Sequence, residues 1–130
     1  MKKVFLGGTC NDTKWRDEII PYLPINYFNP VVEDWTPDCI IKEDKEKEIH
    51  CDTHLYIITP EMKGIYSIAE IMDSLCQNKI VLVGFLRSDK WDDNMKKSIN
   101  ATIRLIKKRY PNTKCEWISE PKEVIEWMKE

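Results

Sequence analysis

Short apolar runs rich in β-branched residues alternate along the chain with longer segments of helical spacing. This alternation limits the possible folds more than any other feature. The clearest run is KIVLVGF, residues 79–85, which is apolar at each position after the first lysine. A strand that is apolar on both faces is typical of a parallel sheet with helices on both sides. The repeated order of strand and helix therefore predicts an α/β fold.

The predicted strands are KVFLGG (3–8), INYFNP (25–30), HLYIITP (54–60), KIVLVGF (79–85) and KCEWIS (114–119). Helical patterns occupy TKWRDEIIPYL (13–23), DKEKEIHC (44–51), SIAEIMDSLCQN (67–78), WDDNMKKSINATIRLIKKRY (91–110) and EPKEVIEWMKE (120–130). The order predicts one domain over residues 1–130, a flavodoxin-like or Rossmann-like three-layer sandwich with a five-stranded parallel sheet. Residues 31–45 have the weakest periodicity, and we interpret them as a flap, although the helix before the third strand begins after Pro37 in one interpretation.

The composition excludes several classes of protein. With 130 residues, 32% charged residues and a net charge of −2, the chain is typical of a globular domain and not of a basic nucleic-acid binder. No apolar run approaches the roughly 20 residues that span a bilayer, and the start MKKVFLGG is too short for a signal peptide. We therefore expect a cytoplasmic protein that binds neither nucleic-acid polymers nor membranes.

Five cysteines are widely spaced and form no C-x-x-C pair. We therefore expect no disulfide framework and no metal site, and we expect the cysteines to be structural. No dinucleotide or phosphate-loop fingerprint is present, and we expect no cofactor. Homo-oligomerisation is a further expectation.

In open α/β sheets, ligands bind beyond the carboxyl ends of the strands. This rule selects GGTCND, NPVVEDW, TPEMKGIYS and GFLRSD, the segments that follow the first four strands. Paired glycines allow a ligand close to the backbone, but a tight turn explains them equally well. Tryptophan and tyrosine here offer stacking platforms, although aromatic side chains are more often core. The predicted substrate-binding residues are Gly7, Gly8, Thr9, Asn29, Pro30, Asp34, Trp35, Glu61, Tyr66 and Ser67, and Trp15 is a further candidate platform.

Glu70 is the acid with two competing interpretations. Ser67-x-x-Glu70 before an apolar run fits a capping box, in which serine and glutamate each cap a backbone N–H. Alternatively, Glu70 points away from the apolar stripe of its helix and lies in the first turn, where the positive helix end favours a carboxylate. An ionised carboxylate at this edge suits a nucleophile. The two interpretations are compatible.

Together, VFLGGT, YFNPVVEDW and CDTHLYIITPEMKGIYSIAEIMDS resemble the nucleoside 2-deoxyribosyltransferase superfamily, in particular its compact nucleoside 2-deoxyribosyltransferase-like branch. The resemblance covers roughly residues 3–85. It implies a flavodoxin-like fold and cleavage of an N-glycosidic bond, with Glu70 as the catalytic nucleophile. It further implies that Asp52, just before the third strand, assists at the base or sugar, and that Glu61 holds sugar hydroxyls.

The resulting hypothesis is a double displacement on a nucleoside or nucleotide, in which Glu70 forms a glycosyl-enzyme ester and Asp52 or another acid protonates the leaving base. The acceptor is a second base in a transferase and water in an N-glycosidase. Two rival hypotheses remain open: a module that binds a nucleotide or nucleotide signal without cleaving it, and an NAD-cleaving glycohydrolase. A response-regulator-like switch is disfavoured, because GGTCND and IITPEM lack the acids that it needs.

Overall fold

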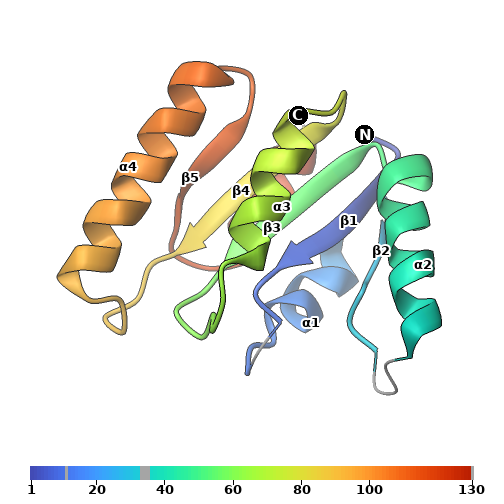
Figure 1. Ribbon diagram of the computed structural model, residues 1–130, viewed down its shortest axis with the longest axis horizontal. Coiled ribbons are helices and arrows are strands. Elements are labelled where there is room, and N and C mark those ends of the chain that lie inside the picture. Colours follow the sequence, from blue (N-terminus) through green and yellow to red (C-terminus); the bar gives the residue numbers. More distant parts are fainter. Residues whose placement is uncertain (11, 33–35, 130) are drawn as a thin grey trace.

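The computed structural model describes residues 1–10, 12–32 and 36–129. Five strands form one parallel sheet in the order β2-β1-β3-β4-β5 (Figure 1). They are β1 (Lys3–Gly8), β2 (Asn26–Phe28), β3 (Thr53–Ile58), β4 (Ile80–Leu86) and β5 (Lys114–Ile118). The predicted α/β sandwich with a five-stranded parallel sheet is confirmed.

Helices cover both faces of the sheet. They are α1 (Trp15–Ile19), η1 (Ile20–Tyr22), α2 (Pro37–Lys45), η2 (Glu46–His50), α3 (Tyr66–Leu75), α4 (Asp93–Arg109) and α5 (Glu123–Lys129). Figure 1 shows α2, α3 and α4 in front of the sheet and α1 behind it. The α5 helix packs with α1, because Val124 and Trp127 share a buried cluster with Trp15 and Ile19.

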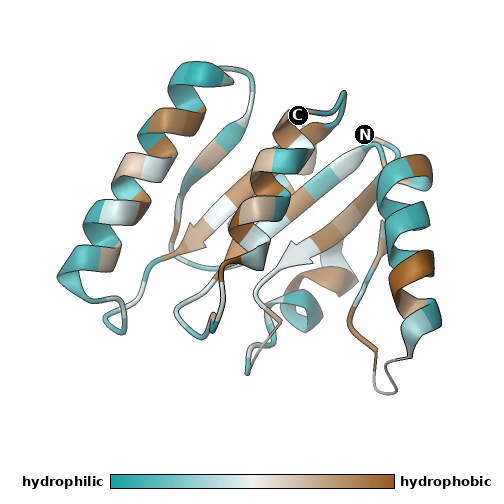
Figure 2. Cartoon of the chain, viewed as in Figure 1, coloured by the Kyte–Doolittle hydropathy of each residue, from teal (hydrophilic) through white to brown (hydrophobic). Residues whose placement is uncertain are grey.

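Alternation along the strands divides the core into two layers. On β1, Val4 and Leu6 face α1 and α5, whereas on β3 Tyr56 and Ile58 face α3 and α4. Helices that cover a sheet need only one apolar side, and Figure 2 shows hydrophobic and hydrophilic residues interleaved along α4. The sequence predicted this layering because its strands are apolar on both faces.

Two local predictions need correction. The segment interpreted as a flap contains α2, which begins at Pro37 directly after the capping residue Thr36; there the Cys39 N–H donates to the Thr36 carbonyl at 2.9 Å. Helix α3 begins at Tyr66 with Ile65 as its N-cap and no side-chain capping bond, so the predicted capping box at Ser67 is wrong. Glu70 consequently lies in the second turn of α3, and its carboxylate is free to reach another element.

The strand order places a ligand-binding edge beside β1. The connection after β1 leads to β2 on one side of it, whereas the chain then continues from β2 to β3 on the other side of β1, and such a switch point opens a crevice at the carboxyl ends of the strands. The two glycines that end β1 have no room for a side chain. A Cβ on Gly7 would lie 2.5 Å from the Tyr56 ring, and Gly8 has φ +107° with the Ile57 carbonyl against it.

Candidate active site

A cavity of about 310 Å³ opens at the carboxyl end of β1, between α2 and α3. Its size falls within the range of small-molecule sites. Four of its lining residues carry the chemistry: Glu70 from α3, Glu43 from α2, Arg16 from α1 and Cys10 from the β1–α1 loop. The remaining walls are Phe5, Gly7, Gly8, Pro30, Val31 and Val32. The cavity therefore combines an apolar lining with a few converging charged groups.

An ion pair holds Glu70 in this cavity. Its Oε2 accepts a hydrogen bond from Lys47 Nζ at 2.7 Å, and the two side chains are only 12% and 10% exposed. Lys47 comes from η2, so the pair links α3 to the segment before β3. The lysine is bonded to one carboxylate oxygen, and the other oxygen accepts no hydrogen bond from the described residues and can approach a ligand.

A chain of buried polar groups holds the backbone of Lys47 in place. Its carbonyl lies 2.8 Å from His54 Nε2, and His54 Nδ1 lies 2.8 Å from Ser74 Oγ, which in turn lies 2.7 Å from the Tyr56 hydroxyl. Burial lowers the pKa of His54 to about 4, so the ring is neutral near pH 7. Burial alone would lower the pKa of Lys47, but the hydrogen bond to Glu70, the charge of Glu70 and the Tyr56 hydroxyl together outweigh burial and raise that pKa. The lysine is therefore held as a cation.

Glu43 is a second carboxylate in the same cavity, and the sequence analysis missed it. Burial raises its pKa, and the negative charge of Glu70 raises it further, with opposition from Lys47. A raised pKa favours the protonated form, which is the form that a general acid needs. The available signal was the run of acids before the third strand, but this run did not show which acid faces the sheet.

Arg16 is a further site residue that the sequence analysis missed. Only 5% exposed, it donates from Nε to the Leu6 carbonyl at 3.0 Å and from Nη1 to the Thr9 carbonyl at 2.8 Å. Burial lowers its pKa from the ordinary value, although an arginine remains protonated near neutral pH. The side chain thus fixes the turn after β1 and brings a positive charge to the cavity wall.

The predicted turn residues fall in and around the cavity. Gly7, Gly8 and Pro30 line it together with Glu70. Thr9 is buried behind the wall, where its hydroxyl accepts the Thr59 N–H at 2.9 Å, and Asn29 accepts the Val31 N–H at 3.1 Å. Both therefore shape the backbone around the cavity.

Other predicted residues lie away from this cavity. Among the described residues, the cavity lining does not include Glu61, Tyr66 or Ser67, and the Tyr66 side chain is 73% exposed. Trp15 is no stacking platform, because it is 2% exposed in the core and its indole donates to the Thr9 carbonyl at 3.0 Å. The predictions for Asp34 and Trp35 fall outside the residues that the structure describes.

Asp52 does not join Glu70. It precedes β3 and therefore lies at the amino edge of the sheet, whereas Glu70 follows the carboxyl edge of the same strand. Its carboxylate accepts the backbone N–H groups of Lys2 and Lys3 at 3.0 and 3.1 Å. Asp52 therefore holds the backbone at the start of the chain, away from the Glu70 cavity, and its part at the base or sugar stays a prediction.

No group of three or more histidine, cysteine, aspartate or glutamate side chains in the described ranges is arranged to hold a metal ion. The helices in the described part of the chain are all too short or too polar to cross a bilayer.

The fold and the cavity define an α/β protein with a half-buried glutamate at the switch point of a parallel sheet. The chain belongs to the nucleoside 2-deoxyribosyltransferase like family, whose family model matches residues 1–88. The matched residues include β1, α2, α3 and all the residues named above around Glu70. This confirms the resemblance drawn from the sequence. No curated protein and no solved structure matched the chain.

Proposed function

We propose that this protein cleaves or transfers the N-glycosidic bond of a (deoxy)nucleoside or nucleotide, with Glu70 as the nucleophile. The observation that carries the proposal is the Glu70 carboxylate on the wall of the switch-point cavity, with one oxygen held by Lys47 at 2.7 Å. Membership of the nucleoside 2-deoxyribosyltransferase like family supports this class of chemistry. The partner is then a small molecule that the cavity can enclose.

In the first step, an oxygen of Glu70 attacks the anomeric carbon and the C–N bond breaks. The bonding electrons leave with the base, which takes a proton from a general acid, and an ester joins Glu70 to the sugar. Glu43 fits the acid role, because it lines the cavity and its pKa is raised by burial and by the Glu70 charge. This places both carboxyl groups on one cavity, as the double displacement requires.

Electrostatic attraction between Glu70 and the sugar favours the reaction but supplies only part of the reduction in its barrier. A sugar ring that develops positive charge about 4 Å from a carboxylate gains roughly 4 kcal/mol at an effective dielectric near 20. Enzymes lower barriers by about 8–23 kcal/mol, so covalent capture and positioning supply the remainder. Lys47 opposes the developing charge, and its contribution is to hold the Glu70 rotamer. Val31 and Val32 add an apolar wall to the cavity.

In the second step, an acceptor attacks the glycosyl ester and releases Glu70. A second base as acceptor makes the protein a transferase, and water makes it an N-glycosidase. Glu43, now deprotonated, removes the proton from either acceptor, which restores both carboxyl groups to their starting states.

To test this, the protein is incubated with a panel of deoxynucleosides, nucleosides and their monophosphates, each with and without a second free base. The products are then separated by chromatography. Release of free base without an acceptor indicates hydrolysis, and a new nucleoside with the added base indicates transfer. Glu70→Gln should abolish either product. Asp73→Asn is the matched control, since Asp73 is exposed on the same helix and its carboxylate accepts a hydrogen bond from Gln77 Nε2 at 2.9 Å.

Recovery of every panel member unchanged, at enzyme concentrations near those of the substrates, would contradict the proposal. Tight binding of an unchanged nucleotide in the same samples would instead support a binding module. Release of nicotinamide from NAD would assign the cavity to NAD cleavage.

A further inference from the structure

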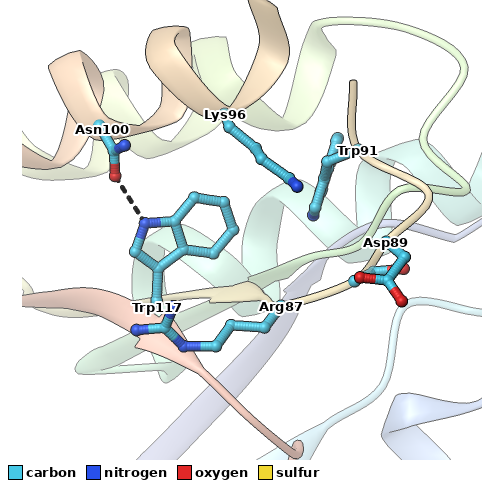
Figure 3. Close-up of a pocket in the computed structure, with 7 residues that line it drawn as sticks. Arg87, Asp89, Trp91, Lys96, Asn100 and Trp117 are labelled. Carbon is cyan, nitrogen blue, oxygen red and sulfur yellow. Dashed lines mark hydrogen bonds between the residues drawn. The ribbon is translucent and has the colours of Figure 1, made fainter. Parts of the chain in front are cut away.

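A second cavity lies at the carboxyl ends of β4 and β5, beneath the start of α4. It has a volume of about 500 Å³ and presents two tryptophans, two cations, an amide and an acid: Trp91, Trp117, Arg87, Lys96, Asn100 and Asp89 (Figure 3). No residue is shared with the Glu70 cavity, and β3 separates β4 from β1 in the sheet. Apart from Arg87 and its neighbour, its lining follows residue 88, where the family match ends.

The two indoles are held in place by the protein. Trp117 Nε1 donates to Asn100 Oδ1 at 2.7 Å, and Trp91 Nε1 donates to the Leu86 carbonyl at 2.7 Å. The ring of Trp117 also packs edge-on against Phe85, with centroids 6.2 Å apart. Figure 3 shows the two indoles on different sides of the cavity, with the Lys96 side chain directed between them. Trp91 is only 5% exposed and backs the cavity, whereas Trp117 is half-buried and can offer a ring face to a ligand.

The cations of this cavity have no acidic partner. Neither Arg87 nor Lys96 forms an ion pair with any residue in the described ranges. The Arg87 guanidinium lies 5.7 Å from the centre of the Trp117 ring, and its backbone N–H donates to the Ile118 carbonyl at 2.8 Å. Two unpaired cations beside aromatic faces favour a ligand that is both anionic and planar.

We propose that this cavity is a second ligand site, which binds a mononucleotide with its phosphate on Arg87 and Lys96 and its base against the Trp117 ring. Two cations match the charge of about −1.5 to −2 that a phosphate monoester carries near pH 7. Asp89 is the acceptor at the cavity rim that suits a ribose hydroxyl. A cavity of this volume encloses one nucleotide, and the net charge of −2 disfavours a nucleic-acid strand over a single unit.

The test follows the tryptophan indole N–H signals in ¹H–¹⁵N spectra, because the chain has five tryptophans and each gives its own signal. Trp117→Phe assigns the signal of Trp117. AMP, GMP, CMP and UMP are titrated separately, and adenosine, inorganic phosphate and a short single-stranded RNA serve as comparison ligands. We expect the Trp117 signal to shift and saturate with at least one mononucleotide.

Substitution separates this site from the Glu70 cavity. The double variant Arg87→Gln, Lys96→Gln should weaken the binding seen at Trp117 by about tenfold or more, because charge-assisted bonds to phosphate are lost. Lys97→Gln is the matched control, since Lys97 is exposed on α4 outside the cavity. Glu70→Gln should leave the Trp117 titration unchanged even where it abolishes glycosidic cleavage, so the two proposals fail separately.

Three results would overturn the inference. The first is a Trp117 signal that does not move with any mononucleotide at millimolar concentration. A second is equal affinity in the wild type and the double variant, with both proteins shown to be folded by their thermal transitions. Third, inorganic phosphate or RNA that binds at Trp117 at least as tightly as every mononucleotide would assign the cavity to a simple anion or to a nucleic acid.

Discussion

Glu70 and Asp52 lie at opposite ends of the strands of one sheet, Glu70 beyond their carboxyl ends and Asp52 at their amino ends, and their surroundings differ. Glu70 is 12% exposed, is paired with a lysine side chain and faces a cavity. Asp52 is 42% exposed and accepts backbone N–H groups from the start of the chain. A carboxylate whose oxygens are bonded to backbone holds structure, whereas one fixed at a single oxygen on a cavity wall is available for chemistry. Of these two acids, Glu70 lines the switch-point cavity, whereas Asp52 holds the backbone at the start of the chain.

The largest expected effect comes from Glu70. Replacing it with alanine removes the nucleophile, and we expect the rate of glycosidic cleavage to fall by about 10⁴-fold or more. Chromatographic assay of base release from the best substrate of the panel measures this. Asp73→Asn on the exposed side of α3 should retain nearly full activity, and comparable losses in the two variants would remove the distinction.

Glu43 should produce the next largest effect. Glu43→Gln cannot donate a proton, and we expect kcat/KM to fall by about 10²–10³-fold, whereas the exposed neighbour Asp44→Asn should change little. The pKa of Glu43 is raised, so its acid form is present at low pH and is lost as pH rises through that pKa. The wild-type profile of rate against pH should therefore decline on its alkaline side, and the variant should lack this decline.

Stability offers an independent check on Glu43. Because its pKa is higher in the folded protein, ionisation above that pKa opposes folding. At neutral pH, Glu43→Gln should therefore unfold at equal or higher urea concentration than the wild type. Marked destabilisation by this substitution would show a structural role in place of the acid role.

Substituting Lys47 tests whether its ion pair holds the Glu70 side chain in place. Lys47→Met leaves the Glu70 carboxylate without its partner at a site that is only 12% exposed, and we expect a loss of about 1–3 kcal/mol in the free energy of unfolding. Urea denaturation measures this, with Lys45→Met, exposed on α2, as the control. Combining Lys47→Met with Glu70→Gln should restore part of the loss, and strict additivity would contradict a direct coupling.

Asp52 should give the smallest effect on activity. Asp52→Asn should leave the rate within about threefold, because the side chain does not reach the cavity. We expect a stability loss of about 0.5–1 kcal/mol from weakened backbone hydrogen bonds at a partly exposed site. A thousandfold loss of activity in a folded Asp52→Asn protein would instead support the role at the base or sugar that the sequence resemblance implies.

The acid dependence of this stability follows from the pKa of Asp52. Partial burial raises that pKa, but hydrogen bonds from the Lys2 and Lys3 N–H groups outweigh burial and lower it. Its contribution is therefore present above the ordinary aspartate pKa and is lost as pH falls through the lowered one. The stability difference between Asp52→Asn and the wild type should shrink below about pH 4.

Much of the fold could be predicted because strands that are buried on both faces of the sheet leave continuous apolar runs in the sequence. KIVLVGF was predicted as 79–85 and forms β4 at Ile80–Leu86. The ligand edge was also predictable, since Gly7 and Gly8 end β1 and line the cavity with Glu70. The position of Asp52 could have been inferred as well, because a residue that precedes a parallel strand lies at its amino edge.

The acid partner and the ion pair could not be predicted from periodicity. Which of the acids before β3 faces the cavity depends on how α2 and the π-helical turn η2 dock on the sheet, and this is a tertiary property. The capping prediction failed because α3 begins one residue earlier than Ser67, which leaves Glu70 free for Lys47. Local sequence rules missed both the acid that faces the cavity and the Glu70–Lys47 ion pair, because both depend on how separate elements pack together.

The most direct test of the central claim is the mass of the intact protein after acid quenching during turnover with its best substrate. A glycosyl ester on Glu70 predicts a fraction of protein heavier by one sugar, with the added mass on the peptide that contains residue 70. The adduct should be present in Asp52→Asn and absent in Glu70→Gln. Turnover without any adduct under fast quenching, or an adduct on another residue, would contradict the account.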